Sequence, residues 1–127
     1  MPKVAIVDDA LLIRIQMKKF FEDIMNFEVV GQGADGNDAI RVYKEKKPDL
    51  MTLDLTMPNK SGVEAIREIM QDNPEARILV VSAIKEASMI TEALHLGAKG
   101  FVNKPLQFSS EEFVESFKED IADALAD

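Results

Sequence analysis

The chain has 127 residues, of which 46% are hydrophobic and 30% charged, so we expect one soluble globular domain over residues 1–127 and no disordered tail. Fifteen Lys and Arg against 23 Asp and Glu give a net charge of −8, and such an acidic surface repels nucleic acid and anionic membranes. Cysteine is absent, which excludes disulfides, thiol chemistry and Cys-based zinc sites. No apolar run approaches the ~20 residues that cross a bilayer, and the start of the chain lacks the pattern of a signal peptide, so we expect a cytoplasmic protein without membrane insertion.

Short apolar runs alternate along the chain with longer segments in which apolar residues recur at helical spacing. The runs predict five strands, in chain order at residues 4–7, 27–30, 49–54, 78–82 and 100–103. The intervening segments predict helices over roughly residues 10–25, from Gly36 to near Pro48, from Val63 to before Pro74, around 90–94 up to Gly97, and over 113–125. A capping-box signal, Ser109-Ser110-Glu111-Glu112, precedes the last helix.

Five strand–helix units in sequence predict an α/β fold with a five-stranded parallel sheet and helices on both faces. The runs at 4–7 and 78–81 are apolar throughout instead of alternating, which is typical of strands buried on both faces. In such a sheet, ligands bind at the carboxyl ends of the strands.

Polar side chains follow four of these strands directly. Asp8 and Asp9 end the first strand, Asp54 ends the third, Ser82 ends the fourth and the fifth runs into Lys104. Each alone has an ordinary interpretation: a helix N-cap for Asp8-Asp9, a turn residue for Asp54 and a surface side chain for Lys104. Because the parallel strands end at one edge, we expect the carboxylates, the hydroxyl and the ammonium to converge there.

Carboxylates gathered in this way repel one another unless a cation or a proton neutralises them. Oxygen ligands favour a hard cation such as Mg²⁺, which can also bridge to a phosphoryl oxygen. Lys104 and Ser82 could bind two further phosphoryl oxygens, and a carboxylate nucleophile could form an acyl phosphate. The residues therefore fit phosphoryl transfer to an aspartate, although their spacing does not say which one.

The chain resembles the receiver domain of two-component response regulators, and in particular the stand-alone, CheY-like kind. The matching motifs run in the family's order over almost the whole chain: Asp8-Asp9, Asp54-Leu55-Thr56-Met57-Pro58-Asn59-Lys60-Ser61-Gly62, Ser82-Ala83, Phe101 and Lys104-Pro105. The resemblance implies a flavodoxin-like (βα)5 fold with strand order 2-1-3-4-5 and a cis peptide bond before Pro105.

The resemblance also implies roles for the site residues. Asp54 would take the phosphoryl group from the phosphohistidine of a histidine kinase or a histidine phosphotransfer domain. Mg²⁺ would be bound by Asp9, Asp54 and the backbone carbonyl of Thr56, with Asp8 acting through water. Ser82 and Lys104 would contact the phosphoryl oxygens.

A switch is implied as well. Ser82 would move toward the phosphoryl group and Phe101 would turn inward behind it, which would remodel the surface of the fourth helix, fifth strand and fifth helix. Phe101 has no hydroxyl, so this coupling would depend on packing. Thr56 and Ile84 lie where the family tunes dephosphorylation, and the bulk of Ile84 could hinder an attacking water.

The resemblance implies a signalling phosphoacceptor and not an enzyme. A phosphatase is a possible further partner. Because only residues 122–127 follow the last predicted turns, we expect action by docking on another protein, in chemotaxis or a phosphorelay, through a surface that includes Met89, Lys99 and Phe101. A receiver domain cut from a longer regulator is an alternative.

Three alternative functions fit the sequence less well. Gly31-Gln32-Gly33-Ala34-Asp35-Gly36 is a literal dinucleotide-binding fingerprint, but it follows the second predicted strand, and a packed glycine-rich loop is preferred. An aspartyl-phosphate hydrolase of the haloacid dehalogenase type would need an acid at Thr56. A domain that keeps only a structural role would not need the whole set of polar residues. His95 is interpreted as a helix-end residue near Gly97.

Overall fold

The computed structural model describes residues 1–126, and its elements follow one another as strand and helix in regular alternation. The strands are β1 (Lys3–Val7), β2 (Glu28–Gly33), β3 (Leu50–Leu53), β4 (Ile78–Ser82) and β5 (Gly100–Asn103). The helices are α1 (Leu11–Lys19), continued by the π-helical segment η1 (Phe20–Ile24), α2 (Gly36–Lys46), α3 (Gly62–Asp72), α4 (Ala87–Leu96) and α5 (Glu111–Leu125).

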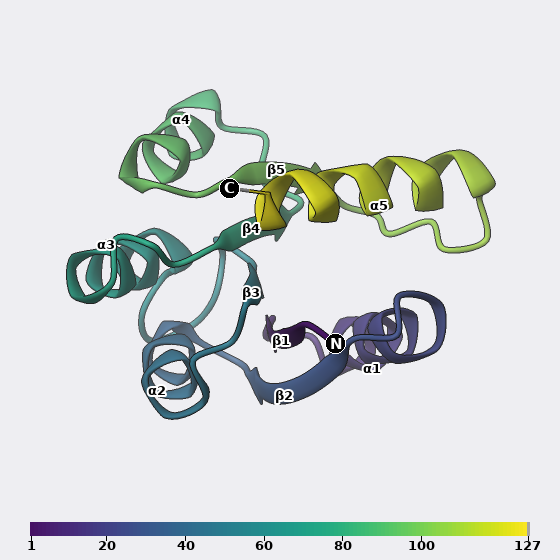
Figure 1. Cartoon of the computed structure of the whole chain (residues 1–127). Helices are drawn as coiled ribbons and strands as arrows, with labels where there is room; N and C mark the ends of the chain where they lie inside the picture. Colours follow the sequence, from purple (N-terminus) through teal and green to yellow (C-terminus); the bar gives the residue numbers. More distant parts are fainter. Residues whose placement is uncertain (127) are drawn as a thin grey trace.

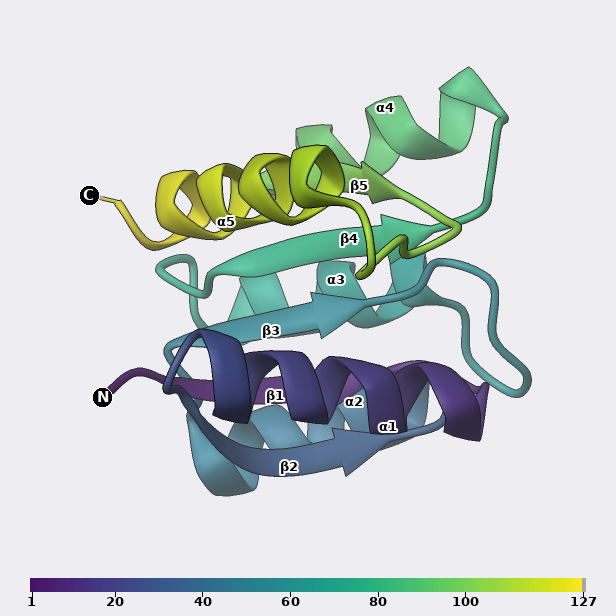
Figure 2. The ribbon, with the colours of Figure 1, turned by 90° about the vertical axis from the view of Figure 1, so that its right-hand side faces the viewer.

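The five strands form one parallel sheet in the order β2-β1-β3-β4-β5, as the family resemblance implies. Figure 1 shows α2, α3 and α4 on one face of the sheet and α1 and α5 on the other. The arrows of β2, β3, β4 and β5 point the same way in Figure 2, and β1 is parallel to its neighbours β2 and β3, so the carboxyl ends of the strands share one edge. This is the flavodoxin-like arrangement, and the crevice of such a sheet lies at that edge.

Two apolar layers hold the helices to the sheet. One lies between the sheet and α2, α3 and α4, and includes Met51, Leu53 and Ile66. The other lies between the sheet and α1, η1 and α5, and includes Ile6, Phe21 and Phe117. Consecutive residues of β1 and β4 lie in opposite layers, which explains why the runs at 4–7 and 78–81 are apolar throughout.

Some boundaries predicted from the sequence differ from those in the structure. The segment at 10–25 is helical but changes to π-helical geometry at Phe20. The second strand continues to Gly33, because Gly31 and Gly33 pair with Ala5 and Val7 of β1. The capping box before α5 is wrong: the cap is Ser110, which accepts a hydrogen bond from the Phe113 N–H, so the third helical residue is a phenylalanine and not a glutamate. A complete capping box instead begins α3, at Ser61 and Glu64.

No helix within residues 1–126 is both long enough and apolar enough to span a membrane.

Candidate phosphoacceptor site

Three carboxylates meet at the carboxyl edge of the sheet. Asp8 and Asp9 follow β1 and Asp54 follows β3, and one oxygen from each lies within 4.8 Å of the others. Backbone bonds align the strand ends: the Asp8 N–H donates to the Gly33 carbonyl (3.0 Å) and the Asp54 N–H to the Val7 carbonyl (3.1 Å). Asp8 and Asp54 are buried, with 3% and 5% of their surfaces exposed, whereas Asp9 is open to solvent.

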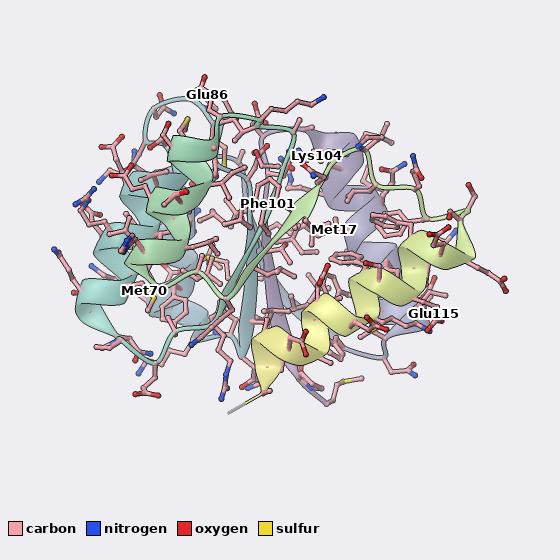
Figure 3. The ribbon with its side chains drawn as sticks, turned by 90° about the horizontal axis from the view of Figure 1, so that it is seen from above. Met17, Met70, Glu86, Phe101, Lys104 and Glu115 are labelled. Atoms are coloured by element: carbon pink, nitrogen blue, oxygen red, sulfur yellow. The ribbon has the colours of Figure 1, made fainter. Side chains whose placement is uncertain are left out.

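Lys104 joins the two buried carboxylates. Its Nζ lies 2.6 Å from Asp8 Oδ2 and 3.0 Å from Asp54 Oδ2. The residue is held where β5 leaves the sheet, because its N–H donates to the Ser82 carbonyl (3.1 Å). The Lys104–Pro105 peptide bond is cis, as the family resemblance implies. Figure 3 shows Lys104 at this end of β5, beyond Phe101 on the same strand. The ammonium therefore neutralises charge that would otherwise be buried without a partner.

The electrostatics follow from this arrangement. Burial raises the pKa of Asp8, and the nearby Asp54 adds to the rise, against the lowering effect of Lys104 and of the Ala10 N–H. Burial alone would lower the pKa of Lys104, but hydrogen bonds to Asp8 and Asp54 outweigh it and raise that pKa. Lys104 is thus a fixed cation at neutral pH.

Ser82 completes the contacts of Asp54. Its Oγ is fully buried and donates to Asp54 Oδ1 at 2.7 Å, while the Thr56 N–H donates to the same oxygen at 3.2 Å. The hydroxyl also accepts from the Ile84 N–H (3.4 Å). Both oxygens of Asp54 are therefore held in fixed directions by residues from three strand ends.

The donor set fits a hard divalent cation. Clustered carboxylate oxygens are the ligands that Mg²⁺ prefers, and the exposed side of Asp9 leaves room for the water molecules that Mg²⁺ keeps. The residues that could hold the ion are Asp8, Asp9 and Asp54, with the Thr56 carbonyl on the adjacent loop.

The predicted convergence of polar residues at this edge is confirmed by these contacts. Thr56 and Ile84 border the site through their N–H groups, which donate to Asp54 and Ser82, whereas Phe101 lies within β5. Thr56 is exposed, and the half-buried Ile84 and Phe101 pack against the apolar layer below α2–α4. Their roles in tuning and switching stay predictions. Exposed His95 lies in the last turn of α4, before Gly97, as the helix-end interpretation expects.

One residue next to the site was missed. Arg14 of α1 donates from Nη1 to the Asp8 carbonyl at 2.6 Å, so its guanidinium lies next to the backbone of the Asp8-Asp9 pair. Its position, five residues after Asp9 in a predicted helix, gave no sign of this contact, because the bond depends on how the chain turns at Ala10.

The glycine-rich segment 31–36 contains no open phosphate-binding loop: residues 31–33 complete β2, and residues 34–36 form a closely packed turn into α2. The Gly36 N–H, which a phosphate would need at a helix start, donates to the Lys60 carbonyl (2.8 Å). A Cβ at Gly33 would lie 2.7 Å from Asp38 Cβ. The glycines therefore serve close packing.

A doubly wound parallel sheet with an acidic cluster, a hydroxyl and a lysine at its carboxyl edge defines the class of phosphoacceptor signalling domains. The chain belongs to the response regulator receiver domain family, whose model matches residues 4–118. It is a response regulator of two-component signal transduction.

Curated relatives support this assignment over most of their length. The chain is 44% identical to the chemotaxis protein CheY of Thermotoga maritima over 105 residues, which are 83% of this chain and 87% of that protein. It is 43% identical to the CheY protein of Bacillus subtilis over 108 residues, with 83% and 87% covered. It is 39% identical to the protein CcdB of B. subtilis over 107 residues, with 84% and 88% covered.

Solved structures share the whole fold. A chain of the CheX–CheY–BeF3–Mg²⁺ complex of Borrelia burgdorferi superposes with a TM-score of 0.88 at 28% identity, covering 98% of this chain and 90% of that one. The response regulator domain of T. maritima CheB gives a TM-score of 0.84 at 32% identity, covering 100% and 98%.

Proposed function

We propose that Asp54 is the phosphoacceptor of this response regulator and that Mg²⁺ bound by Asp8, Asp9, Asp54 and the Thr56 carbonyl assists the transfer. Asp54 is preferred over Asp8 and Asp9 because of its hydrogen bonds. It is the carboxylate that lies within hydrogen-bond distance of both Ser82 and Lys104, whereas Asp8 contacts Lys104 and Asp9 is exposed.

The reaction follows from these contacts. A carboxylate oxygen of Asp54 attacks the phosphorus of a phosphohistidine, and an O–P bond forms while the P–N bond breaks. The imidazole nitrogen leaves with the electron pair of that bond and takes a proton from solvent. Mg²⁺, when bound, supplies positive charge to the transferred group. The Lys104 ammonium stays protonated throughout, so it can stabilise the negative charge on a second oxygen of the phosphoryl group.

The new dianion gives a reason for a switch. The Ser82 hydroxyl donates to Asp54 Oδ1, and Ser82 pairs with Asn103 of the neighbouring strand β5. When this hydroxyl moves toward the phosphoryl group, it leaves space toward Phe101 on the same strand as Asn103. Inward rotation of Phe101 would then change the surface formed by α4, β5 and α5. This is a shift between two packings that the phosphoryl group biases.

The partners follow from the same chemistry. A histidine kinase or histidine phosphotransfer domain supplies the phosphoryl group, and a target protein binds the α4-β5-α5 surface. The CheY relatives support chemotaxis as the pathway, and the CheX–CheY complex supports docking on a further protein. A phosphatase that shortens the phosphorylated state is a possible further partner. Thr56 and Ile84 would set the lifetime of the acyl phosphate, because they border the path of an attacking water.

The protein acts as a phosphoacceptor and not as an enzyme that turns over a substrate, within a single receiver domain.

The test is phosphorylation by a small donor. We expect acetyl phosphate or phosphoramidate with Mg²⁺ to add one phosphoryl group to the parent protein, seen by intact mass and removed by hydroxylamine. Asp54→Asn should accept none, whereas Asp49→Asn, an exposed acid before β3, should be labelled like the parent. Full labelling of Asp54→Asn would overturn the assignment.

A further inference from the structure

The turn between β2 and α2 lies between the two segments that carry the proposed metal ligands. On one side the Gly33 carbonyl accepts from the Asp8 N–H (3.0 Å). On the other side the turn contacts the loop between β3 and α3, which carries Thr56. The Gly36 N–H donates to the Lys60 carbonyl (2.8 Å), and Asn59 Nδ2 donates to Asp35 Oδ2 (2.7 Å). The turn thus contacts both segments at once.

The turn itself is tightly braced. Asp38 Oδ2 accepts from the Ala34 N–H at 2.9 Å, and Asp35 Oδ1 accepts from the Asp38 N–H at 2.8 Å. Close packing of Gly33 against Asp38 leaves no room for a side chain at that glycine. Arg14 links this turn to Asp8. The pKa of Asp38 is lowered mainly by the Ala34 N–H and Arg41, and the nearby charge of Arg14 contributes to the same effect. Arg14 also donates a hydrogen bond to the Asp8 carbonyl.

The β3–α3 loop is closed at its base and held at its tip. At the base, the Gly62 N–H donates to the Leu55 carbonyl (3.0 Å). At the tip, Asn59 has left-handed backbone geometry (φ 65°), which Asn tolerates well, and this places its side chain against Asp35. The Gly36–Lys60 contact is so close that a Cβ at Gly36 would collide with the Lys60 carbonyl. The position of the loop is therefore coupled to the turn.

We propose that the β2–α2 turn is a positioning device for the metal site, with the Asp35–Asn59 hydrogen bond fixing the β3–α3 loop at the distance from Asp8 and Asp9 that a divalent cation needs. The inference rests on the proposed function, since Mg²⁺ is the ion that this spacing would serve. It also gives two glycines of the Gly-x-Gly-x-x-Gly segment a purpose: Gly36 allows the turn to approach the Lys60 carbonyl of the β3–α3 loop, and Gly33 allows the turn to pack closely on Asp38.

The test exchanges the two side chains of the bond. Asn59→Asp places two carboxylates against each other, and we expect Mg²⁺ affinity, measured by calorimetry without any phosphodonor, to fall roughly tenfold, the lower end of the range for groups that orient metal ligands. The added negative charge alone would strengthen Mg²⁺ binding, so weaker binding separates positioning from charge. The double exchange Asp35→Asn with Asn59→Asp reverses donor and acceptor, keeps an oxygen to cap α2, and should restore the affinity.

A second readout needs no metal. Amide hydrogen exchange of Gly36, whose N–H donates to Lys60, should be faster in Asn59→Asp and return to the parent rate in the double exchange. Asn59→Gly tolerates the left-handed backbone without adding a charge, and we expect it to weaken Mg²⁺ binding in the same direction.

Asn73→Asp is the matched control. Asn73 Nδ2 likewise donates a side-chain hydrogen bond, to the Tyr43 hydroxyl (2.9 Å), at the far end of α2 and α3. The substitution adds the same negative charge as Asn59→Asp, but away from the metal site. Its Mg²⁺ affinity should equal that of the parent. Parent-like or tighter binding by Asn59→Asp, or no recovery in the double exchange, would overturn the inference alone. If the parent protein takes up no Mg²⁺, the inference and the proposed function fall together.

Discussion

At the residue scale, the free energy of the site depends on how the buried carboxylates are neutralised. Asp8 and Asp54 are almost fully buried and share one ammonium, that of Lys104. A cation bound beside Asp9 would supply the charge that Lys104 alone does not. Without such a cation the ionised site should therefore reduce stability, and two substitutions test this.

Asp8→Asn should stabilise the metal-free protein at neutral pH. Burial raises the pKa of Asp8 in the folded state, so folding favours its protonated form. The stabilising contribution of Asp8 is present below the ordinary carboxyl pKa and is lost as the pH rises through the raised value. In EDTA at pH 7, we expect urea unfolding of Asp8→Asn at a higher midpoint than the parent, with the gap closing below about pH 4. A gap that grows on acidification would contradict this.

Lys104→Met should destabilise the metal-free protein, because it leaves two buried carboxylates without their shared cation. We expect a loss of roughly 3 kcal/mol in unfolding free energy, the lower end for breaking a buried pair. The loss should shrink when Mg²⁺ is added. Lys118→Met, which breaks an ion pair with Glu115 on the surface of α5, should change stability by less than about 1 kcal/mol. Equal losses in the two variants would show that burial does not matter here.

At the element scale, the loop between β3 and α3 depends on one glycine. The Gly62 N–H closes the loop on the Leu55 carbonyl, and a Cβ at this position would collide with the Asp54 carbonyl and lie 2.7 Å from Leu55 Cα. Both obstacles are backbone atoms of Asp54 and Leu55, which follow β3. The start of α3 and Asp54 are therefore in direct contact.

Gly62→Ala should shift the backbone of Asp54, the proposed phosphoacceptor. We expect a loss of about 3 kcal/mol in stability, the upper part of the range for overpacking, together with slower labelling by acetyl phosphate. Gly100→Ala is the comparison, since its Cβ would meet only Leu79 Cδ1 at 3.2 Å, a side-chain atom that can move. Chemical denaturation and the time course of intact mass measure the two effects. A Gly62→Ala variant that labels at the parent rate would remove the packing argument.

How much the sequence could predict varied with the kind of contact. Apolar periodicity predicted every strand and helix, and the strand-end rule predicted the meeting of Asp8, Asp54, Ser82 and Lys104. The π-helical geometry at Phe20–Ile24 could not be predicted, because it accompanies the packing of Phe20 on Phe108 and Phe117, which come from the other end of the chain. The contacts of Arg14 and Asn59 were also hidden, since each depends on a turn that local patterns do not define.

At the scale of the whole molecule, metal binding and folding are linked. A ligand that binds only the folded state stabilises it, so Mg²⁺ at ten times its dissociation constant should add about 1.4 kcal/mol. We expect a rise in melting temperature with Mg²⁺ for the parent and a much smaller rise for Asp9→Asn. An equal rise in both proteins would place the ion elsewhere.

The phosphoryl group would act on this same linked system. The site joins β1, β3, β4 and β5 at one edge, so a new dianion there would contact both the loops that carry the proposed metal ligands and the strand that leads to α5. We therefore expect a change in charge at Asp54 to reach the α4-β5-α5 surface through Ser82 and Lys104.

The most direct test of the central proposal is to locate the phosphoryl group chemically. Borohydride reduces an acyl phosphate to an alcohol, so a phosphorylated aspartate becomes homoserine and can be found by peptide mass spectrometry. After labelling with acetyl phosphate and Mg²⁺, we expect homoserine at position 54 and unmodified aspartate at positions 8 and 9. Homoserine at position 8 or 9, with Asp54 unchanged, would contradict the account.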